Sequence, residues 1–435
     1  MRQSFKQLPP IPLYQSISKI TKFVNALYDA NNTELVFNYV DAWSSTYTWG
    51  CNDDSCHPEA GDIVVISHGQ HVTLDVDTPL LKALVIMGGT LEFDREIASK
   101  VTLMAEYIIV TQGGHFMIGT EENPFPCDKE AEVVLFGHVR SIRLPVFGTK
   151  VLAVRDGKLD LHGCRKMHTW GVLDSTATAG TNTLTIQQDI SDCDGEGTTT
   201  CTGENCQCWK TGDKIVVATT GGRKSQAETE EHEILSVSGN TVTLVDNLAY
   251  DHTGVESVWL GHDGEARTFN QRAEVGLLSR NVVIRGNLNE EWAYHIPACA
   301  AGIAVGLGEV QTCFEGQFGE EMGSDQFGSQ VMLQFAEYGK IEFIETTHAG
   351  QAFQLGRYPL HFHMSGDQPD SYIRGCSVHK TFNRCSTLHG VNFLTYEHNV
   401  CHENMGLAVF IEDGAEHDNT IQYNLVTFTK WFLGI

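Results

Sequence analysis

Three consecutive stretches of the chain share one layout: IEFIETTHAGQAFQLGRYPLHFHMSG (residues 341–366), YIRGCSVHKTFNRCSTLHG (372–390) and LTYEHNVCHENMGLAVFIEDG (394–414). Each contains a short strand-like run, a polar turn, a second strand-like run and a corner of small residues, and TIQYNLVTF (420–428) begins a fourth. A coil of this size cannot bury an apolar face alone, so successive coils must stack on their neighbours. The repeat therefore predicts a right-handed parallel β-helix.

Stacking also predicts columns of polar side chains. Adjacent coils lie about 4.8 Å apart, so aligned side chains touch. Aligning the corners MSG, HG and DG predicts that His363, His389 and Asp413 form one column. His361 lies two residues before His363, so both project from the same face of their strand.

The same alignment predicts further equivalent positions along the coils. Val378 and Val400 are predicted to share one interior position, and Leu388 and a residue near Ile411 another. A second polar column is predicted from His348, His379 and either Cys401 or His402.

The first polar column has three interpretations, which the sequence leaves open. It can be a polar ladder in which the imidazoles satisfy one another, backbone groups and water. It can be a metal site, because a His-x-His strand plus ligands from the next coil can bind a zinc-like ion. The candidate metal ligands are His361, His363, His389 and Asp413.

The third interpretation is a catalytic or sugar-binding groove. In such a groove a histidine acts as acid or base, and an arginine pairs with a carboxylate on a glycan. The catalytic candidates are His363, His389, Asp413 and Arg357. The glycan-binding candidates are Arg357, Arg374 and Arg384.

The rest of the chain also reads as all-β. Runs such as GDIVVISHG (61–69), LKALVIMGGTLEF (81–93) and VTLMAEYIIVTQGGHFMIG (101–119) alternate apolar and polar residues and end in glycine turns. The segment WKTGDKIVVATT (209–220) is followed by a predicted hairpin that turns at Ser238-Gly239-Asn240. Trp43, Trp49 and Trp209 can be sugar-stacking platforms or core anchors.

Composition limits the classes of partner. The 435 residues carry a formal net charge of −26, so the surface as a whole repels nucleic acid and anionic membranes. No apolar run reaches the roughly 18 residues of a membrane helix. The histidines and carboxylates can bind one class of cofactor, a divalent metal ion that is zinc-like or calcium. Glu320, Glu321 and Asp325 can ligate calcium or form a solvated acidic loop.

The cysteines indicate an oxidising compartment. Most of the 13 lie in short clusters, such as Cys51 with Cys56, Cys193 to Cys208, and Cys299 with Cys313, which favours disulfides. A zinc knuckle at 193–208 is the competing interpretation, although its spacing lacks paired C-x-x-C. An odd total predicts at least one unpaired thiol or one pair in trans. No signal peptide is visible at the N-terminus.

A family resemblance rests on an ordered series of motifs. WSSTYTWG (43–50), PEAGDIVVISHGQHVTLDVDTP (58–79) and LEFDREIASKVTLMAEYIIVTQGGHFMIGTEENPFP (91–126) resemble the eight-glycine (G-eight) domain. RAEVGLLSRNVVIRG (272–286), CFEGQFGEEMGSDQFG (313–328) and HAGQAFQLGRYPLHFHMSGD (348–367) resemble the fibrocystin-L-like family. The candidate glycines of the domain are Gly50, Gly61, Gly89, Gly114, Gly119 and Gly137.

The resemblance covers the chain from about Trp43 onward and implies its organisation. We expect an N-terminal segment (1–42), a G-eight domain (43–158), a β-rich segment with a cysteine-rich insertion (159–271) and a parallel β-helix (272–435). The family also includes the hyaluronan-binding cell-migration-inducing protein and the transmembrane hyaluronidase-like protein. The resemblance therefore implies an extracellular or cell-surface location, as a fragment of a larger membrane-anchored protein.

Two functions from different classes follow. The first is a cell-surface or secreted recognition and adhesion ectodomain that binds extracellular carbohydrate or a cell-surface protein. The alternative is a hyaluronan-type polysaccharide depolymerase, with or without a metal ion, acting in a groove along the β-helix. Fold sharing alone does not decide between them. The outcome depends on whether His363, His389 and Asp413 open into a basic-lined groove.

Overall fold

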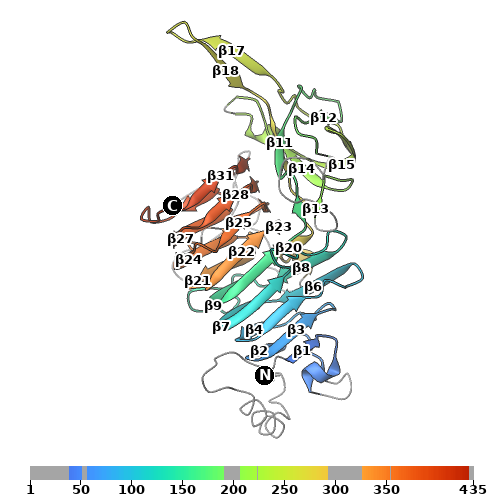
Figure 1. Cartoon of the computed structure of the whole chain (residues 1–435), viewed down its shortest axis with the longest axis vertical. Helices are drawn as coiled ribbons and strands as arrows, with labels where there is room; N and C mark the ends of the chain where they lie inside the picture. Colours follow the sequence, from blue (N-terminus) through green and yellow to red (C-terminus); the bar gives the residue numbers. More distant parts are fainter. Residues whose placement is uncertain are drawn as a thin grey trace.

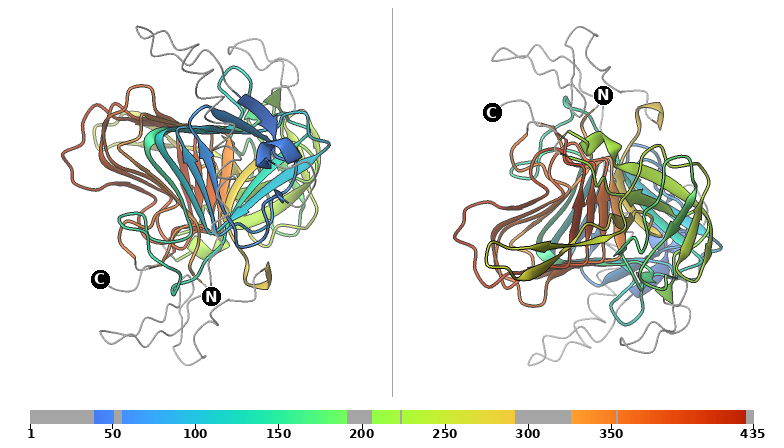
Figure 2. Two further views of the ribbon diagram at one scale, coloured as in Figure 1. Left: turned by 90° about the horizontal axis from the view of Figure 1, so that it is seen from below. Right: turned by 90° about the horizontal axis from the view of Figure 1, so that it is seen from above.

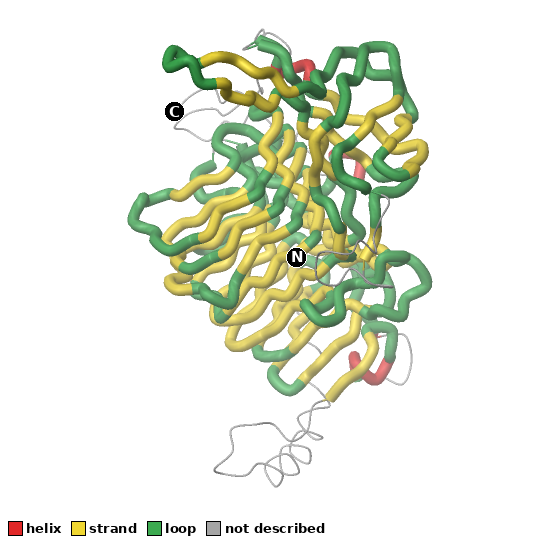
Figure 3. The backbone as a smooth tube through the Cα atoms, turned by 45° about the horizontal axis from the view of Figure 1, so that its top comes forward, coloured by secondary structure: helices red, strands yellow, loops and turns green. Residues whose placement is uncertain are grey.

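The computed structural model describes residues 39–50, 56–190, 206–222, 224–291, 326–352 and 354–430. Apart from short 3₁₀ turns, the regular structure of these residues consists of β-strands (Figure 1, Figure 3). Strands of successive coils pair in parallel, and the long sheets that they form surround one core. A smaller antiparallel sheet is attached at the side. The predicted all-β, parallel β-helix fold is confirmed.

The coils have three faces of parallel strands, which surround the core when viewed from either end of the long axis (Figure 2). The first face contains, in spatial order, β2 (Ile63–Ser67), β4 (Ala83–Met87), β7 (Tyr107–Ile118), β9 (Val151–His162), β21 (Gln330–Gln334), β24 (Leu360–Asp367), β27 (Ser386–Asn392) and β30 (Val409–Ile411). The second face contains β1 (Tyr39–Ala42), β3 (Gln70–Leu74), β5 (Thr90–Phe93), the C-terminal halves of β7 and β9, β22 (Tyr338–Glu342), β25 (Tyr372–Arg374), β28 (Thr395–Glu397) and β31 (Thr420–Gln422). The third face contains β6 (Lys100–Ala105), β8 (Glu130–Leu135), β20 (Val282–Gly286), β23 (Ile344–Thr347), β26 (Ser377–His379), β29 (Val400–His402) and β32 (Leu425–Thr427).

The two longest strands connect the first face to the second. β7 and β9 pair in parallel on both sides of a register shift between Thr111 and Gly114. Gln112 and Asp156 adopt positive φ at these bends. Each long strand therefore contributes one half to each face.

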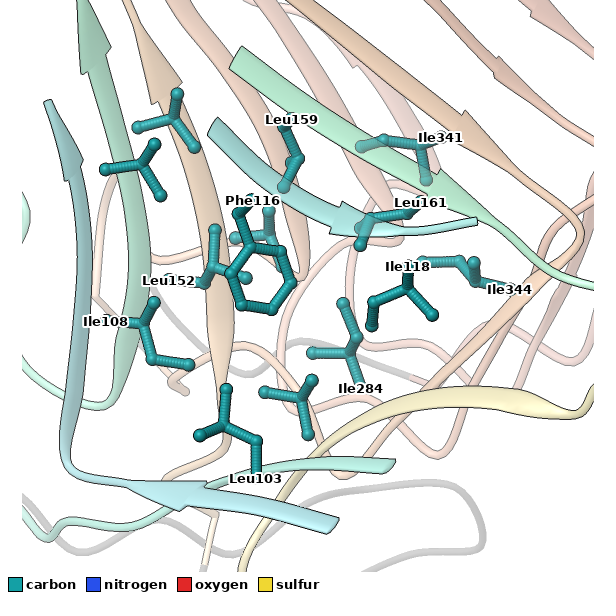
Figure 4. Close-up of a cluster of buried hydrophobic side chains, with 14 of the residues drawn as sticks. Leu103, Ile108, Phe116, Ile118, Leu152, Leu159, Leu161, Ile284, Ile341 and Ile344 are labelled. Carbon is teal, nitrogen blue, oxygen red and sulfur yellow. The ribbon is translucent and has the colours of Figure 1, made fainter. Parts of the chain in front are cut away.

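Alternating apolar residues from all three faces fill the interior. One continuous core includes Phe116, Leu159, Ile284 and Ile341, which are fully buried and come from different coils (Figure 4). The parallel pairing is already present at β1 and β2, so the G-eight-like stretch supplies the first coils of the helix. One sheet thus contains strands from both sides of the predicted domain boundaries at residues 158 and 272. Those boundaries remain a prediction about regions of the sequence.

An antiparallel sheet is inserted between β9 and β20 and has its own core. Its spatial order is β11 (Trp170–Val172), β19 (Glu274–Leu277), β14 (Lys214–Val217), β15 (Glu230–Ser238), β16 (Thr241–Leu244) and β12 (Thr183–Thr185). The hairpin of β15 and β16 confirms the turn predicted at Gly239. A second hairpin, β17 (Glu256–Leu260) with β18 (Ala266–Asn270), projects from the sheet (Figure 1). A separate short pair is formed by β10 (Arg165–Lys166) and β13 (Cys206–Gln207).

Apolar contacts join the inserted sheet to the last coils. Val216 and Leu278 of the insertion pack with Val400 and Leu425 on the outside of the third face. Val400 therefore does not share an interior position with Val378, as the sequence alignment predicted. The register pairs Val378 with Cys401 instead, because this coil is one residue longer than the alignment assumed.

The second predicted interior pair, Leu388 with a residue near Ile411, is correct in its strand register but not in its burial. Leu388 pairs with Ile411 as predicted. Leu388 is buried in the core, whereas Ile411 is 41% exposed, since it lies in the last coil of the described chain.

Disulfides link residues that the sequence did not pair. Cys127 bonds Cys164, and Cys385 bonds Cys401 across the helix interior. Cys56 and Cys208 are also disulfide-bonded, so Cys208 is not a thiolate ligand of a zinc knuckle. Cys376 is a buried free thiol, in line with the odd total. Cys51, Cys193, Cys201, Cys299, Cys313 and the acidic loop Glu320, Glu321 and Asp325 lie outside the described residues.

Trp43, Trp49 and Trp209 are buried core anchors rather than exposed sugar platforms. Trp49 Nε1 donates to the Trp43 carbonyl at 2.6 Å, and Trp209 Nε1 donates to the His168 carbonyl at 2.7 Å. Their polar edges are therefore satisfied inside the fold.

A buried asparagine connects three coils at one corner. Asn399 accepts a hydrogen bond from the Cys376 amide at 2.9 Å and donates to the carbonyls of Ile373 and the Asn424 side chain, both at 3.0 Å. We expect Asn399→Ala to lower the free energy of unfolding by about 2 kcal/mol, because buried backbone groups lose their partners. Urea denaturation measures this loss. Asn247→Ala at an exposed site is the control, and equal destabilisation by both variants would contradict the prediction.

Candidate functional site

The predicted histidine column lies on the outer side of the first face. β24 and β27 pair in parallel, with His361 opposite Thr387 and His363 opposite His389. Leu360 and Phe362 alternate with the histidines and point into the core. The period of two along β24 therefore turns both of its imidazoles outward, as the sequence predicted.

Three imidazoles meet at this position. The Nδ1 atoms of His363 and His389 lie 3.1 Å apart, and one nitrogen from each of His361, His363 and His389 lies within 4.8 Å of the others. His361 is only 1% exposed. Its Nδ1 donates to the Gly356 carbonyl at 3.2 Å, while its Nε2 is buried and has no hydrogen-bond partner.

The surroundings keep the histidines of β24 neutral. Burial lowers the pKa of His361 well below its usual value, and the nearby His363 adds to this effect. Burial also lowers the pKa of His363, and His389 and Arg357 lower it further. Neutral imidazoles offer lone pairs, which metal ions and hydrogen-bond donors need.

The carboxylate that stands next to His389 in the column is not the one that the sequence predicted. Leu388 pairs with Ile411, so Glu412 follows His389 in the column, and Asp413 lies one position further. Asp413 Oδ2 still reaches His389 Nε2 at 3.1 Å, on the side of the ring away from His363. Glu412 Oε2 lies 3.6 Å from His389 Nδ1 and has no hydrogen-bond partner.

The three candidate arginines have different environments. Arg384 stacks between Tyr358 and Phe410, at 4.4 Å and 3.9 Å from their ring centroids. Tyr358 in turn contacts the His361 ring, so Arg384 lies beside the histidine cluster. Arg357 donates to the Val146 carbonyl at 2.6 Å and lies close enough to lower the pKa values of His361 and His363.

Arg374 lies on the second face, away from this cluster. It donates to Glu342 at 2.9 Å and to Glu121 at 2.8 Å. Since both carboxylates already hold its guanidinium, Arg374 is not placed to act with the histidines, which corrects its grouping with Arg357 and Arg384.

The second predicted column is on the third face, with a different register. His379 pairs with Thr347 and with His402, so His348 and Cys401 are each displaced by one position from the column. His379 Nε2 lies 2.9 Å from Glu345, and His402 Nε2 lies 3.1 Å from Glu231. These imidazoles are occupied by carboxylates, and Glu231 comes from the inserted sheet.

A buried ion network on the second face was missed at the sequence level. His162 is fully buried and lies 3.1 Å from both Asp160 and Glu342. Asp160 also accepts from the Tyr338 hydroxyl at 2.8 Å and contacts His115 at 2.6 Å. Charged and apolar residues alternate in KLDLH (158–162) and GKIE (339–342), which indicates that the charged side chains of each segment share one face but not that the two segments pair.

Within the described chain, no helix has the length and apolar character needed to span a membrane.

Comparison with known proteins matches two family models. Residues 48–174 match the G8 domain, and residues 326–434 match the CEMIP beta-helix. Fibrocystin-L from Homo sapiens is 46% identical over 403 residues, which covers 91% of this chain and 9% of that protein. Fibrocystin from Canis lupus familiaris is 28% identical and has the same coverage of both chains.

The chain thus spans about 9% of the length of these relatives. The predicted resemblance to fibrocystin-L and to the G-eight domain is confirmed. Among solved structures, the Pseudomonas phage phi297 tailspike gp61 aligns with 75% of this chain and 42% of that chain, at 11% identity and a TM-score of 0.21. That score is too low to support an argument.

Proposed function

Because the chain is a fibrocystin-L-like segment with a G8 domain and a CEMIP beta-helix, we propose that it is part of a cell-surface or secreted recognition ectodomain. Its ligand is an acidic extracellular glycan, which binds on the first face beside the histidine cluster. The hyaluronan-binding members of the family that this chain resembles also contain a G-eight domain and a β-helix, which supports this class of ligand. The disulfides among the described residues suit an oxidising, extracellular compartment.

The proposal rests on the surroundings of the Arg384 guanidinium. Its guanidinium is held between two aromatic rings, and in the described part of the chain no carboxylate lies within ion-pair distance of it. A stacked guanidinium keeps its planar fork available, and that fork fits a carboxylate or sulfate bidentately. Because the two rings already fix the Arg384 side chain before a ligand arrives, less side-chain entropy is lost on binding.

Local charge permits an acidic ligand here despite a net charge of −26 for the whole chain. Arg357 lies beside His361 and His363. Burial lowers the pKa of Arg357, and the nearby positive charge of Arg143 lowers it further. We define Arg143, Arg357 and Arg384 as the arginine group. Glu412 and Asp413 border it on the side of the last coil, so polyanion binding depends on these few cations and weakens with salt.

Arg384→Gln is expected to weaken the binding of hyaluronan or heparin oligosaccharides by about tenfold to a hundredfold, because one charge-assisted bidentate contact is lost. Calorimetry or surface plasmon resonance at two salt concentrations measures the change. Arg267→Gln is the matched control, since Arg267 also stacks on a ring, that of Trp259 at 5.8 Å, but lies on the projecting hairpin.

Absence of binding by the unmodified protein, or an equal loss in the Arg267 variant, would overturn the proposal. Gel analysis of glycan length after incubation tests the alternative function. Shortening of the chains, abolished by His363→Ala, would replace the recognition function with a depolymerase.

A further inference from the structure

We propose that His361, His363 and His389 form a binding site for a zinc-like divalent metal ion, with Glu412 as the fourth ligand. The site stands apart from the glycan proposal, because it depends only on the imidazoles and carboxylates of β24, β27 and the coil that follows. Binding of metal and binding of glycan are measured separately, so either can fail alone.

The spacing of the nitrogens fits a single ion. Two nitrogens bound to one zinc at about 2.0–2.1 Å in a tetrahedron lie about 3.3 Å apart. The Nδ1 atoms of His363 and His389 are 3.1 Å apart, and the third imidazole nitrogen lies within 4.8 Å of both. The three rings are also in contact, with centroids 4.8 to 6.1 Å apart. Small side-chain adjustments would bring all three to one centre.

Two acceptors outside the cluster set the tautomers that a metal needs. The Gly356 carbonyl accepts from His361 Nδ1, so the lone pair of a neutral His361 is on Nε2. The carboxylate of Asp413 lies 3.1 Å from His389 Nε2, which favours the tautomer with the proton on Nε2 and the lone pair of His389 on Nδ1. Metal-binding histidines commonly donate their second nitrogen to a carbonyl or carboxylate in this way. Asp413 is therefore a positioning residue rather than the ligand that the sequence predicted.

Two buried atoms lack partners at the same place. A hydrogen-bonded histidine ladder explains the His363–His389 contact, since one Nδ1 can donate to the other. It leaves His361 Nε2 buried without a partner, which costs about 1–3 kcal/mol. Glu412 Oε2 is likewise buried without a hydrogen-bond partner, 3.6 Å from His389 Nδ1. A cation bound by both His361 and Glu412 would satisfy both atoms, whereas the ladder satisfies neither.

The donor set selects the class of metal. Imidazole nitrogens suit zinc, copper, nickel, cobalt and iron, whereas calcium and magnesium prefer oxygen ligands. Arg357 opposes a cation here, and the carboxylates of Glu412 and Asp413 offset it. Three imidazoles and one carboxylate would complete a tetrahedral zinc site.

The test begins with zinc content. We expect purified protein to carry about one zinc per chain by mass spectrometry. Titration of the chelator-treated protein with Co²⁺ should give the visible absorption of a tetrahedral site. His363→Gln and His389→Gln should each lower zinc affinity by at least about a hundredfold. Asp413→Asn should lower it by about tenfold to a hundredfold, since it removes an exposed positioning residue without opening the core.

His417→Gln is the control, because His417 is an exposed histidine of the same coil that is bonded to Asp418. Its zinc affinity should equal that of the unmodified protein. The proposal is overturned if the folded protein, with β-rich circular dichroism, takes up neither zinc nor cobalt. It is also overturned if Asp413→Asn and both histidine variants retain the original affinity. Metal binding without any glycan binding would leave this site in place and remove only the proposed ligand.

Discussion

Gly114→Ala is expected to destabilise the β-helix by about 3 kcal/mol, because an added methyl group has no space at the bend of β7. A Cβ on Gly114 would lie 2.3 Å from the Ile86 carbonyl oxygen and 2.9 Å from that of Thr111. Both neighbours are backbone atoms of packed strands, so they cannot move aside as a flexible side chain does. The midpoint and slope of urea denaturation measure the loss.

Gly222→Ala is the matched control for this substitution. No heavy atom lies within 4 Å of a Cβ added at Gly222, so a change within about 0.5 kcal/mol is expected. Similar stabilities for the Gly114 variant and the unmodified protein would show that the coils at β4 and β7 are not packed as described. Equal destabilisation by both variants would show that the close contacts of the added methyl group do not control the effect, because the loss of unfolded-state entropy on replacing glycine with alanine is itself stabilising.

Glycine content predicted turns well, but it could not separate tight positions from open ones. Gly61 and Gly114 both belong to the series that resembles the G-eight domain. A Cβ on Gly61 meets nothing within 4 Å, although its φ of +88° favours glycine. Gly114 is constrained by Ile86, a residue of the previous coil. Such contacts between coils depend on packing that a single stretch of sequence does not contain.

The repeat after Lys340 predicted neighbours where the coil length was evident. The alignment predicted that His363 and His389 are neighbours, and they do pair in the structure, although the register shifts after them and Gly366 pairs with Val391 rather than with Gly390. The next coil is shorter at its corner, so Glu412 rather than Asp413 follows in register. A shift of one residue reverses the face of every side chain, so errors of this size matter for a site. The roles of these residues stay predictions until metal and glycan are measured.

The second-face network escaped prediction because its members are distant in sequence. His162 and Glu342 are 180 residues apart, and the inserted sheet lies between them. No repeat joins β9 to β22 in the sequence, so nothing indicates that Asp160 and Glu342 flank one histidine. Only the return of the chain to the same sheet after the insertion brings them together.

Asp160→Ala is expected to lower the free energy of unfolding by about 4 kcal/mol, because it leaves a buried imidazolium with one carboxylate instead of two. Tyr338 and His115 lose the acceptor of their hydrogen bonds in the same step. Urea denaturation near pH 5.5 measures this effect. Asp246→Ala, at an exposed carboxylate without a hydrogen bond to a described residue, is the control and should change stability by less than about 0.5 kcal/mol.

The pH dependence identifies the charge state on which this network depends. Burial opposes ionisation, but hydrogen bonds from His115 and His162 hold the pKa of Asp160 below 3.8, and those from His162 and Arg374 hold the pKa of Glu342 below 4.5. Their stabilisation is present above these values and is lost as pH falls through the folded pKa values. Burial also opposes charging of His162, but its two carboxylate partners raise its pKa above 6.5. That contribution is complete below pH 6.5 and is lost as pH rises through the folded pKa.

The network therefore stabilises the protein most between about pH 4.5 and 6.5, since both carboxylates and the imidazole are then charged. The Asp160 variant should lose most of the decline in stability above pH 6.5, because one of the two groups that raise the pKa of His162 is gone. A variant with the same alkaline decline as the unmodified protein would mean that His162 is neutral in the folded state. The buried contacts on the second face would then be hydrogen bonds between an imidazole and carboxylates, without a buried positive charge to hold the coils on either side of the insertion together.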